Sequence, residues 1–163
     1  MATAGAKSDT RLEIRRTFAA PREKVFAAWT EKKRLEQWMC KDVPEHNPKY
    51  TELDLRPGGR YVIEIAMPKQ GFTYRGHGTF REVKPPEKLV FTWAWEQIPP
   101  PEKKDEDMED SESLVTVELI ARGNSTEMIF THENFTTAKV RDSHQKGWDG
   151  CFDALDKVLA EKN

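Results

Sequence analysis

The last part of the chain carries the pattern that most restricts how this sequence can fold. Between residues 136 and 162, apolar or semi-apolar side chains recur at steps of three and four, the spacing of one face of an α-helix. These positions are Val140, His144, Trp148, Cys151, Phe152, Leu155, Val158 and Leu159. Charged residues occupy the opposite side. We therefore expect one long amphipathic helix that needs an apolar surface to lie on.

The segments before this helix predict that surface. Apolar and polar residues alternate over 11–18, 60–67, 72–83, 114–121 and 126–133, as in half-buried strands. A short strand is expected at 51–55, and Leu89, Phe91, Trp93 and Trp95 form the inward row of another strand. Turns rich in Pro or Gly separate consecutive strands, which favours an antiparallel arrangement. We expect an α+β domain in which a curved antiparallel sheet of about six strands wraps around the long C-terminal helix.

Two short helices are expected after the first strand. One begins near Pro21, a residue suited to the first turn of a helix, and buries Val25, Phe26 and Trp29. The other covers about 32–39. Gly76 and Gly78 interrupt the strand 72–83 on its inward face, which predicts a bulge or a sharp curvature there.

Length and charge set the domain organisation. A chain of 163 residues is the size of one domain. We expect residues 1–10 to form a disordered tail and residues 11–163 a single domain. The net charge of -2 gives no general attraction to nucleic acid or to anionic membranes. The sequence shows neither a membrane span nor a signal core, and its two cysteines, Cys40 and Cys151, are expected to be reduced thiols. These features predict a cytoplasmic protein that is a monomer or a weak homodimer.

One segment differs in composition from the rest. Residues 96–113, EQIPPPEKKDEDMEDSES, are rich in proline and acids and offer little to bury, which predicts a mobile hairpin loop. A cation site is the alternative, but the acids lack the ligand spacing of a calcium loop.

Five stretches in series resemble a known family. They are FAAPREKVFAAWTEKKRLEQWM, LDLRPGGRY, GTFREVKPPEKLVFTWAW, STEMIFTHENF and GWDGCFDALDKVL. Together they resemble the AHSA-type branch (activator of heat-shock-protein ATPase homologue) of the START-like, or SRPBCC, superfamily. The resemblance spans about residues 12–159. It implies a helix-grip fold with a cavity between the sheet and the C-terminal helix. Relatives include apolar-ligand carriers, aromatic polyketide cyclases, antibiotic-sequestering proteins and chaperone cofactors, so it does not imply one activity.

Aromatic residues supply the candidate ligand site. Strand parity and helix spacing aim several of them at the space between sheet and helix, and such a lining with few polar groups is typical of pockets for apolar ligands. The predicted ligand-binding residues are Trp38, Tyr74, Trp93, Trp95, Phe130, His132, Trp148 and Phe152. Trp29, by contrast, is expected to be ordinary core.

His132 has two interpretations. It either hydrogen-bonds a neighbour and seals the core, or it orients a ligand or transfers a proton. His132-Glu133 lacks the second histidine of a zinc helix motif, and no metal or cofactor site is predicted. Asp54, Arg56 and Arg60 form either turn-stabilising ion pairs or, alternatively, a catalytic polar cluster.

Two classes of function follow, with an enzyme as a third. The first is a module that binds a small hydrophobic or aromatic molecule, as a carrier, sensor or sequestering protein. The second is a protein-interaction domain that acts as a chaperone ATPase activator-like cofactor. A cyclase or hydrolase acting on an aromatic substrate is the third, and the lack of a matched acid–base pair argues against it.

Overall fold

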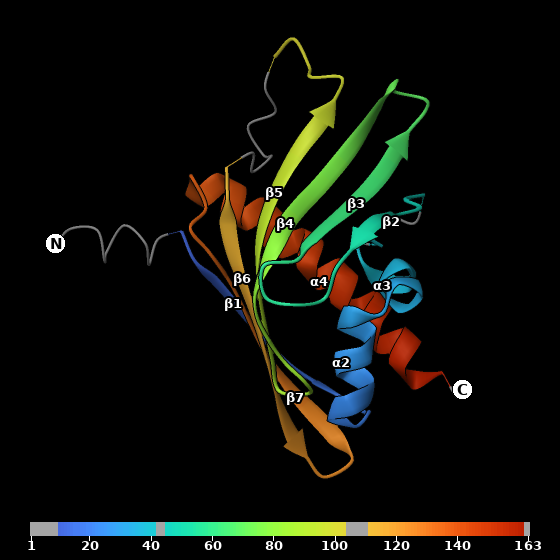
Figure 1. The fold of residues 1–163 in the computed structure, drawn as a ribbon, viewed down its shortest axis with the longest axis vertical. Coiled ribbons are helices and arrows are strands. Elements are labelled where there is room, and N and C mark those ends of the chain that lie inside the picture. Colours follow the sequence, from blue (N-terminus) through green and yellow to red (C-terminus); the bar gives the residue numbers. More distant parts are fainter. Residues whose placement is uncertain (1–9, 42–44, 104–110, 162–163) are drawn as a thin grey trace, which may run out of the picture.

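The computed structural model describes residues 10–41, 45–103 and 111–161. The chain begins with β1 (Leu12–Phe18), followed by the helices α2 (Arg22–Thr30) and α3 (Lys32–Trp38). Six further strands follow: β2 (Lys49–Leu53), β3 (Arg60–Met67), β4 (Phe72–Lys84), β5 (Lys88–Ile98), β6 (Ser113–Arg122) and β7 (Ser125–Glu133). The long helix α4 (Ala138–Ala160) ends the described chain (Figure 1).

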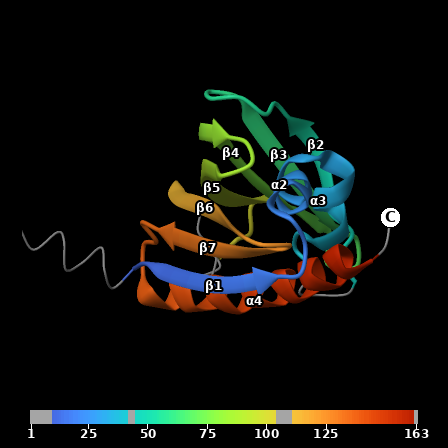
Figure 2. The same ribbon diagram turned by 90° about the horizontal axis from the view of Figure 1, so that it is seen from below.

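All strands belong to one antiparallel sheet with the order β1-β7-β6-β5-β4-β3-β2. The sheet therefore has seven strands, and the prediction of about six is one too low. The edge strands are β1, which pairs with β7, and β2, which pairs with β3. The sheet curves around the helices without closing on itself, as Figure 2 shows, so the α+β helix-grip prediction is confirmed.

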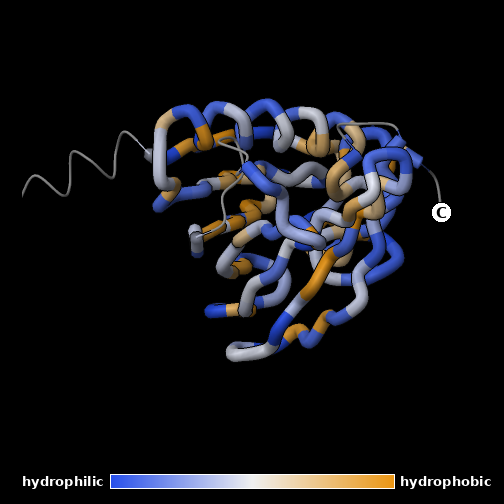
Figure 3. Tube along the Cα trace, turned by 90° about the horizontal axis from the view of Figure 1, so that it is seen from above, coloured by the Kyte–Doolittle hydropathy of each residue, from blue (hydrophilic) through white to orange (hydrophobic). Residues whose placement is uncertain are grey.

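The predicted C-terminal helix is confirmed, and its stripe is the buried face. Its buried residues are Val140, Trp148, Cys151, Phe152, Leu155 and Leu159. The Thr137 hydroxyl caps the helix by accepting a hydrogen bond from the backbone N–H of Val140 (3.1 Å). In Figure 3 the outward turns of α4 are mostly hydrophilic, while hydrophobic positions gather on the strands in the middle of the molecule.

Two side chains and one backbone N–H fasten α4 to the rest of the domain. Arg16 of β1 forms an ion pair with Asp153 (2.8 Å). Lys24 of α2 donates to the carbonyl oxygen of Leu159 (3.0 Å) near the helix end. The backbone N–H of Cys40, just after α3, donates to the sulfur of Cys151 (3.1 Å). The two cysteines, distant in sequence, are thus neighbours; both are buried, and they are not joined by a disulfide.

Strand β4 contains a distortion, but not at its glycines. The register between β4 and β5 is the same at Gly76 and at Phe80 and shifts between Phe80 and Glu82, so the bulge lies beyond the glycines that predicted it. The turn before β3 is held against the same place, because the backbone N–H of Gly58 donates to the Phe80 carbonyl oxygen (2.8 Å). Gly58 has φ +86°, a conformation that favours glycine.

The connection between β5 and β6 is shorter than the loop predicted for residues 96–113. β5 continues to Ile98 and β6 begins at Ser113, so both ends of the expected loop belong to strands. Residues 104–110, and residues 1–9 of the expected tail, lie outside the described residues. In the described ranges, no helix combines the length and the apolar character needed to cross a membrane.

Candidate functional site

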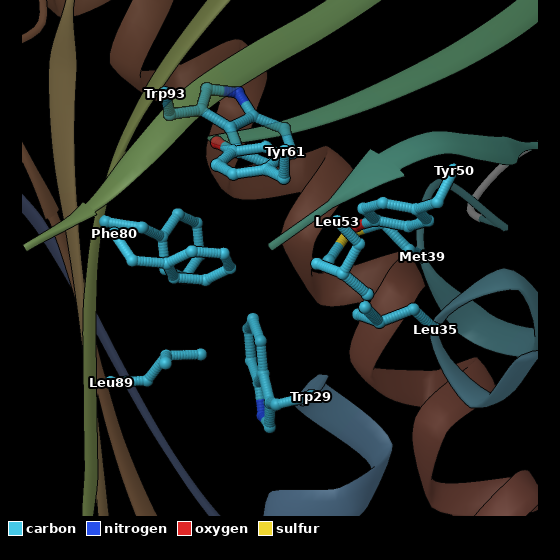
Figure 4. A pocket seen from close by; sticks show the side chains of 10 residues that line it. Trp29, Leu35, Met39, Tyr50, Leu53, Tyr61, Phe80, Leu89 and Trp93 are labelled. Atoms are coloured by element: carbon cyan, nitrogen blue, oxygen red, sulfur yellow. The ribbon is translucent and has the colours of Figure 1, made fainter. Parts of the chain in front are cut away.

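A cavity lies between the curved sheet and the two short helices (Figure 4). The empty space within it, including its opening to solvent, is about 270 Å³. Uncharged, mainly apolar side chains line it: Trp29, Leu35, Met39, Tyr50, Leu53, Tyr61, Phe80, Leu89, Phe91 and Trp93. We call it the aromatic cavity.

Strand parity and helix placement explain this lining. Tyr61, Phe80, Phe91 and Trp93 occupy inward positions of β3, β4 and β5, where alternate residues share one face. Trp29 of α2 closes the opposite side, as Figure 4 shows. None of the ten lining residues comes from α4. This cavity is therefore bounded by the sheet and by α2 and α3.

The space between sheet and α4 holds a second group of aromatic residues, the inner aromatic cluster of Trp38, Phe130, Trp148 and Phe152. All four side chains are buried, with exposures from 0% to 4%. The ring centroids of Phe130 and Trp148 lie 4.6 Å apart, and those of Phe130 and Phe152 5.1 Å apart. Such contacts are typical of a packed core.

A third group continues the aromatic rows beyond the cavity. The ring of Trp95 packs against Trp93 (centroids 5.4 Å apart) and against Tyr74 (6.2 Å), which in turn contacts Phe72 (5.0 Å). Phe72, Tyr74 and Trp95, the outer aromatic row, are only partly buried. They lead from the wall of the cavity toward the ends of β4 and β5.

The predicted site residues are therefore distributed over three places. Trp93 lines the aromatic cavity, and Tyr74 and Trp95 belong to the outer aromatic row. The inner aromatic cluster and His132 lie in the core behind it. Direct ligand contact by these residues stays a prediction, with Trp93 in the most direct position.

Sequence reasoning missed most of the lining. Trp29 was expected to be ordinary core; it is buried, but it also forms a wall of the cavity. Tyr61, Phe80 and Phe91 had the inward parity that could have identified them. Leu35 and Met39 carried no comparable signal, because their position depends on how α3 crosses the end of the sheet.

His132 has hydrogen-bond partners at both ring nitrogens. The indole N–H of Trp148 donates to Nδ1 (3.1 Å), and because indole is only a donor, Nδ1 is unprotonated. Nε2 therefore carries the proton and donates to the hydroxyl of Ser113 (2.7 Å). Ser113 in turn donates to the carbonyl oxygen of Trp93 (2.8 Å). This geometry favours the interpretation of His132 as a residue that seals the core.

The same bonds argue against a serine nucleophile. Ser113 and His132 resemble a nucleophile–base pair by distance, but the histidine donates to the serine instead of accepting its proton. Burial, and secondarily His144, lowers the pKa of His132 well below its usual 6.5, so the ring stays neutral. The two side chains are 1% and 0% exposed, which leaves no access for a substrate.

Two buried tyrosines and the turn before β3 have structural explanations. Burial raises the pKa of Tyr50 and of Tyr61 well above the usual 10.0, so both hydroxyls remain protonated. At the turn before β3, Arg56 pairs with Asp54 (2.9 Å), which fits the turn-stabilising interpretation of that cluster. Among the described residues, no three His, Cys, Asp or Glu side chains are grouped so that they could hold a metal ion.

Comparisons with known proteins agree with this architecture. Among solved structures, protein CV1439 from Chromobacterium violaceum superposes with a TM-score of 0.78 at 20% identity, covering 94% of this chain and 99% of the other. Mll3558 from Rhizobium loti gives 0.74 at 24% identity, with 92% and 96% covered. The AHSA1 protein SPO3351 from Silicibacter pomeroyi gives 0.72 at 26% identity, with 92% and 97% covered.

No curated protein matches the sequence significantly. The model of one protein family, however, matches residues 19–160, which is most of the chain and includes both short helices, the sheet from β2 to β7 and α4. The chain belongs to the family described as Activator of Hsp90 ATPase homolog 1-like protein.

Proposed function

We propose that this protein binds a small hydrophobic or aromatic molecule in the aromatic cavity, as a carrier, sensor or sequestering protein. The observation that carries the proposal is the lining: ten uncharged, mainly aromatic or aliphatic side chains around one opening. Burying apolar surface against such walls yields about 25 cal/mol per Å², so a compact ring system gains affinity without charged partners.

Non-catalytic binding is the form of this function that the site supports best. The one serine–histidine pair described above is buried, with its protons committed to other acceptors. The Tyr61 hydroxyl donates to the carbonyl oxygen of Thr92 inside the sheet. The lining therefore offers a surface for binding and no group poised for proton transfer. We expect a monomer or weak homodimer acting in the cytoplasm.

The first test is titration of the purified protein with bicyclic hydrocarbons such as indane. We expect saturable quenching of tryptophan fluorescence, because Trp29 and Trp93 form walls of the cavity. The compound should be recovered unchanged. Leu53→Phe, which adds bulk to a partly buried lining position, should weaken binding about tenfold, the effect of roughly 1.4 kcal/mol.

Leu55→Phe is the matched control. Leu55 is 37% exposed and is not among the lining residues, so the same added bulk should change affinity less than twofold. Equal weakening by both substitutions, or no saturable response from the wild type, would contradict the proposal.

A further inference from the structure

Four of the side chains that line the aromatic cavity carry an N–H or O–H group: Trp29, Tyr50, Tyr61 and Trp93. The indole nitrogens of Trp29 and Trp93 are fully enclosed, and Figure 4 draws them on the sides of the rings that are turned away from the cavity. The Tyr61 hydroxyl is already committed, because it donates to the carbonyl oxygen of Thr92. The hydroxyl of Tyr50 is therefore the polar group of the lining that a ligand can address.

Tyr50 reaches the cavity from the edge strand β2. The residue is 4% exposed, and in Figure 4 its ring runs from β2 toward the cavity, with the hydroxyl oxygen at the inner end. The position of the oxygen has an effect across the cavity: after burial, Tyr50 is the next cause that raises the pKa of Tyr61. The hydroxyl groups of these two lining residues thus lie near each other, on the cavity side of their rings.

The Tyr50 hydroxyl has no hydrogen-bond partner in the part of the chain that the structure describes. The backbone N–H of Tyr50 donates to the carboxylate of Glu36 (2.8 Å), but the side-chain oxygen makes no such bond. Unlike the two indole nitrogens, this oxygen is not fully enclosed by protein atoms. A hydroxyl that folding removes from water without a partner carries a free-energy cost, and a bound ligand that pairs with it relieves that cost.

The surroundings of Tyr50 restrict the group that pairs with it. The pKa of Tyr50 is raised well above 10.0, mainly by burial, so the hydroxyl keeps its proton and can donate it to an acceptor. The carboxylate of Glu36 beside Tyr50 disfavours a second negative charge there. The lining residues carry no positive charge that would compensate an anion. A neutral oxygen acceptor fits these conditions better than a carboxylate does.

We propose, building on the proposed function, that Tyr50 determines the specificity of the aromatic cavity by donating its hydroxyl proton to a carbonyl or hydroxyl oxygen of an uncharged, mainly apolar ligand. Burial against the remaining lining supplies most of the affinity. The Tyr50 hydroxyl selects ring compounds that carry one oxygen over hydrocarbons of the same shape.

The test compares 1-indanone, which has a ketone oxygen, with indane, which has the same rings without it. Each compound is titrated into the wild type and into Tyr50→Phe by calorimetry. Phenylalanine keeps the ring in the wall and removes only the hydroxyl. The substitution should weaken 1-indanone binding about five- to tenfold and change indane binding less than about twofold, so that the ratio of the two dissociation constants shifts.

Tyr61→Phe is the matched control, because it removes the lining hydroxyl that is committed to Thr92. It should leave that ratio unchanged. If both compounds bind and Tyr50→Phe does not shift the ratio, or Tyr61→Phe shifts it equally, the inference fails while the proposed function stands. If neither compound binds the wild type, both fail.

The infrared carbonyl band of bound 1-indanone gives a second measurement that does not depend on affinity. A ketone that accepts a hydrogen bond absorbs at a lower frequency than one that does not. The band should therefore lie at a lower frequency in the wild type than in Tyr50→Phe. The same frequency in both proteins would overturn the inference.

Discussion

At the scale of single residues, the clearest feature is the hydrogen-bond network through His132. Trp148, His132, Ser113 and the carbonyl group of Trp93 form a row in which each donor has an acceptor. This row joins α4 to β7, β6 and β5. Because the acceptor at Nδ1 must stay unprotonated, the network is intact only while His132 is neutral.

This network makes stability depend on pH. In the unfolded chain His132 titrates near its usual pKa of 6.5, whereas burial lowers the pKa in the folded protein. Below about pH 6.5 the unfolded state therefore binds a proton that the folded state does not, and stability present above that pH is lost as the pH falls. We expect a loss of at most about 1.4 kcal/mol per pH unit from this group.

Urea unfolding of the wild type and of His132→Gln between pH 5 and 8 measures this contribution. The variant should be less stable at pH 8 and should show a flatter decline below pH 6.5. Parallel pH profiles for the two proteins would contradict the assignment of this titration to His132.

At the scale of elements, side-chain hydrogen bonds at Thr92 join β3, β4 and β5 beside the cavity. The backbone N–H of Thr79 donates to the hydroxyl of Thr92 (2.8 Å), and the Tyr61 hydroxyl donates to the Thr92 carbonyl oxygen. Gly78 lies at this place because a Cβ there would overlap that same backbone carbonyl. A Cβ at Gly76 would instead meet side-chain atoms of Ile63 (2.9 Å) and Trp95 (3.2 Å).

The two glycines should therefore respond differently to alanine. Gly78→Ala forces the backbone of β5 to move and should cost about 3 kcal/mol or more. Gly76→Ala meets the branch methyl of the buried Ile63 and the ring of Trp95, which must move but are not backbone, so its cost should be about 1–2 kcal/mol, less than that of Gly78→Ala. Urea unfolding of both variants checks this, and similar losses would show that the backbone contact is not the deciding one.

At the scale of the whole molecule, one hydrophobic core joins the sheet to all three helices. Residues of every helix and of the strands β1 to β7 belong to a single cluster of buried side chains. The helices and the sheet cover each other's apolar faces, so separating them would expose both faces to water. We therefore expect a single cooperative unfolding transition.

Leu155→Ala tests whether α4 and the sheet unfold together. Leu155 of α4 is 0% exposed, so the truncation should cost about 2–5 kcal/mol. Tryptophan fluorescence and circular dichroism should both shift to lower urea by the same amount. Asp156→Ala, on the exposed side of the same helix, should change stability by less than about 0.5 kcal/mol. Separate transitions for the two signals would show that α4 unfolds on its own.

Much of the fold could be predicted from local patterns, because each pattern depends on backbone geometry alone. Steps of three and four from Val140 to Leu159 identified α4, and alternation identified the strands and their inward rows. The glycines of β4 indicated a distortion in that strand, but the register shift lies beyond them, between Phe80 and Glu82. The segment of β2 was predicted as a strand, but a sheet of about six strands was expected, because tertiary contacts decide whether a short segment pairs at a sheet edge.

The sequence alone thus determined which residues face inward, and the tertiary structure decided what each inward residue meets. Phe130 and Trp93 have the same inward character and both pack against Trp148 of α4, but of the two only Trp93 also lines the aromatic cavity beside α2. The alternation of residues along a strand determines which face of the sheet a side chain lies on. The curvature of the sheet and the positions of the helices determine which part of that face borders a cavity. The place of Trp29 in the wall of the cavity also depends on tertiary structure, because the local sequence does not show where a short helix packs against the sheet.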